Sequence, residues 1–175
     1  MRSGDGIAAS VVTTGLGEAV RTIYSAFVIV LILATLKGDA QAYIERPPLK
    51  APNNGGVYVI AHRGAHQGIP ENTLAAYQKA IDLGCDFVEV DIRTTKDGKF
   101  VSIHNGTIDA YVEGATGRIR DFTLAELRGF DIGKRMGPAW ERTRIPTFEE
   151  ILDLCKGRIG IYLDLKDGSI AELVK

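Results

Sequence analysis

The stretch FVEVDIRTTKDGKFVSIHN, residues 87–105, carries the pattern that decides the fold. Side chains along a strand alternate between its two faces, so the valines and the isoleucine of FVEVDI share one face while Glu89 and Asp91 lie on the other. A tight turn at KDG, residues 96–98, separates this strand from a second apolar run that ends on His104. The stretch therefore predicts two strands, each with one apolar face and one face that becomes polar toward the strand's end.

Similar strand patterns recur along the chain and alternate with helix patterns. The predicted strands are VYVIAHR (57–63), DFVEVDI (86–92), KFVSIHN (99–105) and IGIYLDLK (159–166). Strands that alternate with helices favour a parallel sheet covered by helices, the α/β class. Ligands of such sheets gather beyond the carboxyl ends of the strands, which is where the polar residues of these segments lie.

The predicted helices are marked by apolar periodicity and by capping residues. The segment 72–84 predicts a helix with Asn72 or Thr73 as its N-cap and with three apolar residues on one face: Leu74, Tyr77 and Ile81. Three further helix starts carry the capping-box pattern: Thr123 with Glu126, Thr147 with Glu150, and Ser169 with Glu172. Residues 105–122 show no periodicity and predict a polar loop.

The composition is that of an ordinary soluble globular protein of one domain. Of 175 residues, 45% are apolar and 25% are charged, and the net charge is −1. A near-neutral chain lacks the pervasive basic surface on which non-specific nucleic-acid binding depends, so DNA and RNA are not expected partners. A small phosphate ester remains compatible with this balance, because it needs only local cations.

The first 42 residues differ from the rest of the chain. Residues 23–36 form an apolar run shorter than the roughly 18 to 20 residues that cross a bilayer, and the small residues Ala40 and Ala42 suit signal-peptidase cleavage. We predict a signal peptide at 1–42, with an uncleaved membrane anchor as the alternative, a linker at 43–56 and the folded domain at 57–175. The mature domain is then exported to the periplasm or the cell exterior and inserts in no membrane.

The two cysteines, Cys85 and Cys155, are open to two interpretations. In an oxidising compartment they can form a disulfide, whereas two buried thiols behave as small hydrophobic residues. The sequence favours the second, because nothing in it brings the two residues together.

Three acidic residues on strand faces predict a metal site. Glu89 and Asp91 are two residues apart on one face, and Asp164 occupies the equivalent face of another strand. Like charges at this range disfavour each other unless a cation lies between them, and Mg²⁺ or Ca²⁺ prefers carboxylate oxygens. The alternative is a solvated strand face, or carboxylates paired with Arg93 or Lys166.

Histidines and cations near strand ends are the candidates for catalysis and phosphate binding. His62 and His104 follow separate strands and can act as general acid and general base, because imidazole titrates near neutrality. Arg63 offers a bidentate fork for a phosphate and Lys166 a point charge. Surface solvation competes with this interpretation, more strongly for Arg63, whose position alternates with that of His62. His66 lies in a Gly-rich loop and is assigned a structural role.

Several motifs in series make the chain resemble the glycerophosphodiester phosphodiesterase family. They are AHRG (61–64), PENTLAAY (70–77), FVEVDIRTTKDGKFV (87–101), the following His104, TLAEL (123–127) and IPTFEEIL (145–152). The resemblance implies a TIM-type (β/α)₈ barrel that hydrolyses glycerophosphodiesters to glycerol 3-phosphate and an alcohol with one bound divalent cation, Ca²⁺ or Mg²⁺. It also implies that a neighbouring glycerol hydroxyl attacks first, giving a cyclic phosphate that water then opens.

The resemblance assigns a role to each candidate residue. His62 and His104 match the acid and base, Arg63 the phosphate-contacting arginine, Glu89, Asp91 and Asp164 the metal ligands, and Lys166 a substrate-binding cation. Two positions depart from the family pattern. Asp164 stands where glutamate is usual, and Asn105 follows His104 where aspartate is usual, so an amide rather than a charge orients the ring.

Length is the third departure. A barrel of this kind takes about 250 residues, so residues 57–175 are expected to be its N-terminal half, truncated, with an open sheet that invites pairing into a homodimer. Two other functions remain open. One is a phospholipase-type phosphodiesterase that acts on intact or lysolipid, and the other is a non-catalytic remnant that serves only as an association module.

Overall fold

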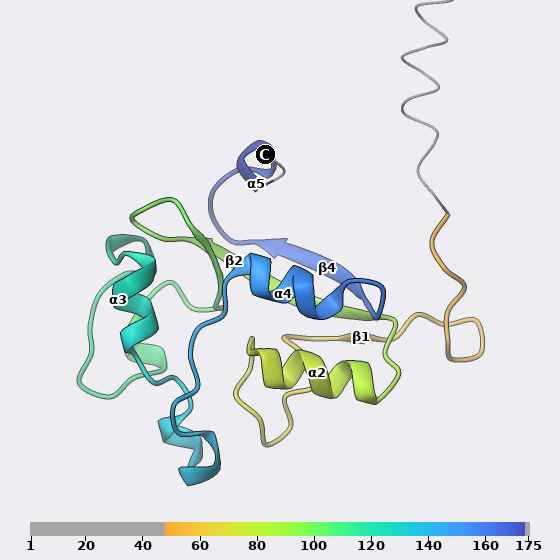
Figure 1. Cartoon of the computed structure of the whole chain (residues 1–175), viewed down its shortest axis with the longest axis horizontal. Coiled ribbons are helices and arrows are strands. Elements are labelled where there is room, and N and C mark those ends of the chain that lie inside the picture. Colours follow the sequence, from red (N-terminus) through yellow and green to blue (C-terminus); the bar gives the residue numbers. More distant parts are fainter. Residues whose placement is uncertain (1–47, 174–175) are drawn as a thin grey trace, which may run out of the picture. The chain divides into compact units, whose positions relative to one another are not determined.

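The computed structural model describes residues 48–173, which form a four-stranded sheet with helices (Figure 1). The chain divides into two units, 1–50 and 51–175, and the second contains every element named here. In order these are β1 (Ile60–Ala61), α2 (Leu74–Asp82), β2 (Phe87–Thr94), β3 (Phe100–Ser102), η1 (Ile108–Ala110), η2 (Ile119–Asp121), α3 (Leu124–Gly129), η3 (Lys134–Met136), η4 (Pro138–Trp140), α4 (Phe148–Cys155), β4 (Gly160–Leu165) and α5 (Ile170–Leu173).

Strand β2 is the centre of the sheet. It pairs in parallel with β1 and with β4, in a register that sets Asp91 opposite Asp164. These two pairings confirm the predicted parallel sheet, whereas β3 runs antiparallel to β2. The reason is the short connection, since Thr95 N donates to Lys99 O at 2.8 Å and closes a tight turn, whereas a parallel neighbour needs a crossover of a dozen or more residues.

The apolar face of β2 packs under helices α2 and α4, as the α/β interpretation predicts (Figure 1). Val88, Val90 and Ile92 are fully buried there. Each such side chain contributes about 1.5–3 kcal/mol of transfer free energy. Their partners in this core are Tyr77, Ala80, Phe148, Ile151 and Cys155.

Helix α2 begins after Thr73, whose hydroxyl accepts the Ala76 amide, so Thr73 rather than Asn72 is the N-cap. The predicted apolar face is wrong for Leu74, which is 37% exposed, because the buried face of α2 consists of Ala76, Tyr77 and Ala80. The small side chain of Ala76 lets the loop after β1 approach closely. A Cβ added at Gly64 would lie 2.7 Å from Ala76, so this position requires glycine.

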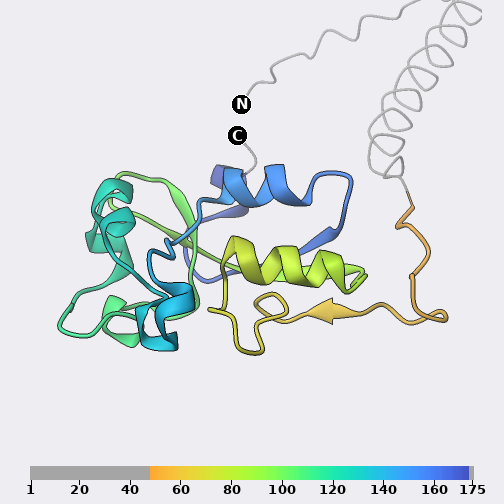
Figure 2. The same ribbon diagram turned by 60° about the horizontal axis from the view of Figure 1, so that its bottom comes forward.

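A second core lies between β3 and α3, beside the sheet (Figure 2). The predicted polar loop at 105–122 contributes to it, because the two 3₁₀ turns η1 and η2 bury Ile108 and Ile119. Single apolar residues at wide spacing have no helical or strand period, so their burial cannot be predicted from the sequence pattern. The cluster consists of Val101, Ile103, Ile108, Ile119, Leu127, Ile132 and Ile145.

The local predictions about helix starts and cysteines are confirmed. Reciprocal capping bonds are present at Thr123 and Thr147, and Ser169 exchanges the same bonds with Glu172. Cys85 and Cys155 are both free thiols in the first core.

The predictions for the N-terminal segment concern residues that the structure does not describe. The signal peptide at 1–42 and residues 43–47 of the predicted linker lie outside the described part. Within residues 48–173, no helix is long and apolar enough to cross a membrane.

Candidate active site

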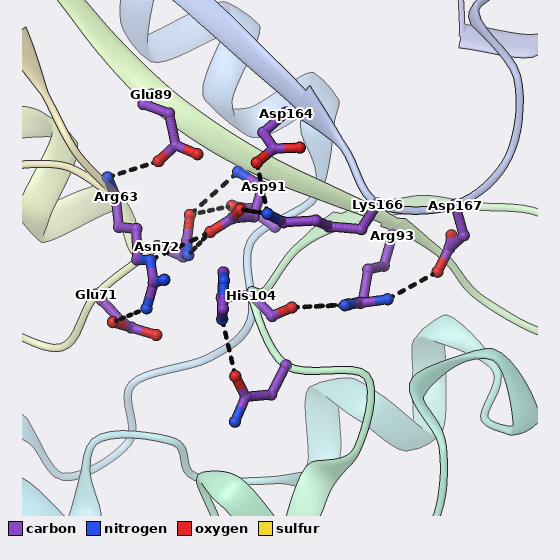
Figure 3. A network of polar contacts seen from close by, with 12 residues as sticks. Arg63, Glu71, Asn72, Glu89, Asp91, Arg93, His104, Asp164, Lys166 and Asp167 are labelled. Atoms are coloured by element: carbon purple, nitrogen blue, oxygen red, sulfur yellow. Dashed lines mark hydrogen bonds and ion pairs between the residues drawn. The ribbon is translucent and has the colours of Figure 1, made fainter.

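Three carboxylates from β2 and β4 converge on one face of the sheet (Figure 3). Glu89, Asp91 and Asp164 each offer an oxygen, and these oxygens lie within 4.8 Å of one another. The parallel register explains the arrangement, because Asp91 stands opposite Asp164 and Glu89 stands two residues earlier on the same face of β2. The sequence prediction that these three residues meet is therefore confirmed.

Asp91 is the fully buried member of this acidic cluster. Asn72 Nδ2 donates to its Oδ2 at 2.7 Å, and Lys166 Nζ forms an ion pair with its Oδ1 at 2.9 Å. Burial by itself raises the pKa of Asp91, but the hydrogen bonds from Asn72 and Lys166 outweigh burial and hold the pKa below its ordinary value. Asp91 is thus kept as a carboxylate, the form that binds a metal.

Asn72 is a site residue that the sequence reasoning missed. Its backbone adopts φ 53°, a left-handed conformation that asparagine tolerates better than most residues. Its Oδ1 accepts the Tyr77 hydroxyl at 2.8 Å, the Ser102 hydroxyl at 3.0 Å and the Asp91 amide at 3.3 Å. One amide side chain therefore ties α2 and β3 to the metal-site strand. The sequence placed Asn72 beside Thr73 as a candidate N-cap, so its hydrogen bonds to Asp91, Tyr77 and Ser102 were not predicted.

Glu89 and Asp164 are held less tightly than Asp91. Glu89 Oε2 accepts the Arg63 amide at 2.8 Å, and burial, only partly offset by that bond, raises the pKa of Glu89. Asp164 is 43% exposed and forms an ion pair with Lys166. Lys166 therefore bridges Asp91 and Asp164, which confirms the predicted alternative of a Lys166 ion pair.

Arg63 points toward the acidic cluster even though its place in the predicted strand opposed that of His62 (Figure 3). Strand β1 ends at Ala61 and Arg63 has φ 54°, so the alternation of strand faces no longer applies. Its Nε lies 3.6 Å from Asp91 Oδ2 and its Nη1 pairs with Glu71 Oε2 at 3.0 Å. Arg93, the other predicted partner, instead binds Asp167.

The two candidate histidines lie near different members of the acidic cluster. A positive charge on His62 lowers the pKa of Glu89, and one on His104 lowers the pKa of Asp91, so both rings are within electrostatic reach of it. The ring of His104 is oriented by Asn105, whose Oδ1 lies 2.8 Å from Nδ1, as the sequence predicts for this amide. His66 lies edge-on to His62 with ring centroids 6.4 Å apart.

The acidic cluster fits a hard divalent cation. Its donors are all carboxylate oxygens, two of the three residues are buried, and a third comes from a separate strand. In this structure the ammonium group of Lys166 partly offsets the negative charge of the cluster through its ion pairs with Asp91 and Asp164. Mg²⁺ and Ca²⁺ both match this donor set.

Comparison with known proteins identifies the family. The model of the "Glycerophosphoryl diester phosphodiesterase family" matches residues 62–171, which include every candidate residue named above. The chain belongs to this family. Among curated members of the glycerophosphoryl diester phosphodiesterase family, the glycerophosphodiester phosphodiesterase of Caldanaerobacter subterraneus is 40% identical over 113 residues, covering 64% of this chain and 46% of its own length.

Solved structures of family members share the fold. The glycerophosphodiester phosphodiesterase of Agrobacterium tumefaciens superposes with a TM-score of 0.64 at 31% identity, over 67% of this chain and 51% of its own. The Oleispira antarctica phosphodiesterase, solved with the product sn-glycerol-3-phosphate, has a TM-score of 0.59 at 35% identity, over 63% of this chain and 44% of its own. The chain thus spans about half the length of these relatives.

Proposed function

We propose that the chain hydrolyses glycerophosphodiesters to glycerol 3-phosphate and an alcohol with the help of a divalent cation. The observation that carries the proposal is the convergence of Glu89, Asp91 and Asp164, whose oxygens lie within 4.8 Å of one another, with His62 and His104 within electrostatic reach. The Oleispira antarctica relative, which binds sn-glycerol-3-phosphate, supports the choice of substrate. We also propose that the described elements are the first strands and helices of a (β/α)₈ barrel.

Glu89, Asp91 and Asp164 would hold the cation, Mg²⁺ or Ca²⁺, through their oxygens. A cation bound there polarises the phosphoryl group and offsets the negative charge that grows on its oxygens. Arg63 and Lys166 add fixed positive charge for the same oxygens. The guanidinium of Arg63 pairs with Glu71, and the backbone amide of Arg63 donates a hydrogen bond to Glu89. The guanidinium is therefore oriented before substrate binds.

The histidines move the protons. Asn105 Oδ1 is a carbonyl oxygen and can only accept, so the neutral His104 ring carries its proton on Nδ1 and presents an unprotonated Nε2. Nε2 of His104 therefore suits the general base that takes the proton of the attacking hydroxyl. His62, on the Glu89 side of the acidic cluster, donates a proton to the leaving alkoxide. The attacking oxygen is that of the neighbouring glycerol hydroxyl, which forms a new P–O bond as the bond to the alcohol breaks and so gives a cyclic phosphate. Water, activated by a histidine, then adds to the phosphorus as one ring P–O bond breaks, which leaves glycerol 3-phosphate.

The direct test measures glycerol 3-phosphate release from glycerophosphocholine by the full chain with Mg²⁺ or Ca²⁺ and with a chelator. We expect release that the chelator abolishes, and a fall of about 100-fold or more in His62→Ala and in His104→Ala. Glu113→Gln changes an exposed residue outside the site and serves as the control. Release that survives chelation and both histidine changes would rule out this mechanism.

Two further aspects of the proposal have their own measurements. The same assay with lysophosphatidylcholine in place of glycerophosphocholine separates a diesterase from a phospholipase-type enzyme, and we expect the water-soluble diester to be the better substrate.

We also propose export, on the strength of the apolar run at 23–36 and the small residues before position 43. N-terminal sequencing of the secreted protein should begin at Tyr43, and an intact N-terminus would indicate an anchor.

A further inference from the structure

A cavity of about 390 Å³ adjoins the acidic cluster on the side of Arg63. Its volume is in the range of about 300–1,000 Å³ that is usual for small-molecule sites. The walls come from the loop after β1, the residue after His104, and the segment that contains η1 and η3. The residues that matter below are Arg63, Glu71, Asn105, Tyr111, Arg135 and Met136.

The cavity meets the catalytic face through two residues. Arg63 lines the cavity and also lies 3.6 Å from Asp91, so a phosphate bound at its guanidinium sits at the cavity mouth. Asn105 lines it from the other side and contacts His104. A group esterified to that phosphate can therefore extend into the cavity while the ester oxygen stays near the histidines.

The acidic group in the cavity wall is already neutralised. Glu71 Oε2 pairs with Arg63 Nη1 at 3.0 Å, and its Oε1 accepts the Tyr111 hydroxyl at 3.3 Å. Burial raises the pKa of Tyr111 to about 12, so its hydroxyl keeps its proton. Glu71 thus has little attraction left for a cationic headgroup.

The cavity wall also carries a cation, Arg135, without an acidic partner among residues 48–173. Arg135 Nη1 donates to the Ala110 carbonyl at 2.9 Å, which fixes the guanidinium at the cavity, and no carboxylate within residues 48–173 pairs with it. An exposed arginine with free donors forms charge-assisted hydrogen bonds with carboxylates in a bidentate geometry. The cavity therefore has a net positive character beside an apolar portion that includes Met136.

We propose that this cavity holds the alcohol part of the diester and that Arg135 selects alcohols that carry an anionic group, such as a carboxylate. The proposal rests on the proposed diesterase function and names the substrate class of that same site. It assigns Arg135 as a specificity residue that contacts the leaving alcohol and takes no part in proton transfer.

A pair of substrates that differ by one carboxylate tests this directly. Glycerophosphoserine and glycerophosphoethanolamine share the ammonium group and differ only in the carboxylate. We expect the full chain to show a kcat/KM about fivefold higher for glycerophosphoserine, the factor that one partly exposed ion pair provides. Arg135→Gln should bring the ratio close to one, and Arg135→Lys should keep most of it. Arg120→Gln, an exposed arginine outside the cavity, should leave the ratio unchanged.

Equilibrium binding keeps this proposal separate from the proposed function. Calorimetry with the same two diesters and Mg²⁺, in a His104→Ala background that does not turn them over, should show the same fivefold preference, and adding Arg135→Gln should remove it. A chain that prefers glycerophosphoserine in binding but hydrolyses neither diester would refute the diesterase function alone. Equal affinities for the two diesters, or a preference that survives Arg135→Gln, would refute the role of Arg135.

Discussion

The two parallel strands that carry the acidic cluster, β2 and β4, differ in how completely they are covered. Every residue of β2 from Val88 to Ile92 is buried, and the strand has neighbours on both edges. Among residues 48–173, β4 pairs with β2 alone, and its Tyr162 and Leu163 are 56% and 41% exposed. The same contrast extends to the acids, because Asp91 is 0% exposed while Asp164 is 43% exposed.

The contrast shows that half of the site is held rigidly and half is held loosely. Asp91 is positioned by Asn72, Lys166 and the backbone of its own sheet, so its geometry is set by the fold. Asp164 has an ion pair with Lys166 and a side chain that is 43% exposed, so fewer contacts position it. In the proposed metal site, Asp91 is therefore the more firmly positioned ligand and Asp164 the less firmly positioned one.

The largest difference is expected in catalysis when each acid is changed to its amide. Asp91→Asn should lower kcat/KM for glycerophosphocholine by about 1,000-fold or more, because it removes the anchor for the cation and its charge. Asp164→Asn should cost about 10- to 100-fold. Asp153→Asn, an exposed acid on the far side of α4, is the control. Equal losses in the two variants would show that Asp91 and Asp164 contribute equally, which would contradict the difference described above.

The next difference concerns stability. Asn72→Ala leaves Asp91, Tyr77 and Ser102 with unsatisfied buried groups and should lower the free energy of unfolding by about 2–4 kcal/mol. Tyr162→Ser on β4 should change it by less than about 0.5 kcal/mol. Urea denaturation followed by circular dichroism measures both.

A glycine at position 72 separates the side chain from the backbone. Asn72→Gly removes the hydrogen bonds but accepts φ 53° without strain, so it should retain more stability than Asn72→Ala. If both variants were as stable as the wild type, the buried network would not be what positions Asp91.

Lengthening each acid by one methylene should have opposite effects. Asp164→Glu has open space and restores the residue usual in the family, so Mg²⁺ affinity should rise by about threefold to tenfold. Asp91→Glu forces an extra methylene into a fully buried site and should weaken both Mg²⁺ binding and folding, the latter by about 1–3 kcal/mol. Isothermal titration calorimetry decides between these directions, and a gain in both variants would show that the two sites are equally adaptable.

The smallest effect concerns the helix that covers β2. Arg128 binds Glu150 with two hydrogen bonds and lowers the pKa of Glu150 from its ordinary value of 4.5, with burial opposing and the Thr147 capping bond assisting. A lowered folded-state pKa stabilises the fold at pH above 4.5, and this contribution is lost as the pH falls through the folded-state pKa.

The corresponding variant is Glu150→Gln, which should reduce the free energy of unfolding at pH 7 by about 1 kcal/mol or less and flatten its decline below pH 4.5. Thermal melts from pH 3 to pH 7 measure this. Glu149→Gln, at the exposed neighbouring position, should behave as the wild type. An unchanged pH profile in Glu150→Gln would show that the ion pair adds nothing.

Features that depend on the local periodicity and spacing of residues, such as strand faces and helix starts, could be predicted from the sequence. The alternation in FVEVDI put Glu89 and Asp91 on one face, and the capping boxes marked three helix starts. Prediction from the sequence failed where backbone geometry or distant packing decides. Arg63 escapes the strand alternation through its positive φ, and the role of Asn72 depends on three partners from other elements. Neither the backbone conformation of Arg63 nor the hydrogen-bond partners of Asn72 produce a periodic pattern in the sequence.

The β2–β3 hairpin has a consequence for the order in which the site is assembled. Ile103 N donates to Asp91 O at 3.1 Å, so the residue before His104 is hydrogen-bonded to Asp91, a proposed metal ligand only 12 positions earlier. Hairpins of this size close in about 1–10 μs, far faster than the roughly 5–20 residues per second of synthesis. During translation, Asp91 and His104 can therefore come together before Asp164 has been synthesised.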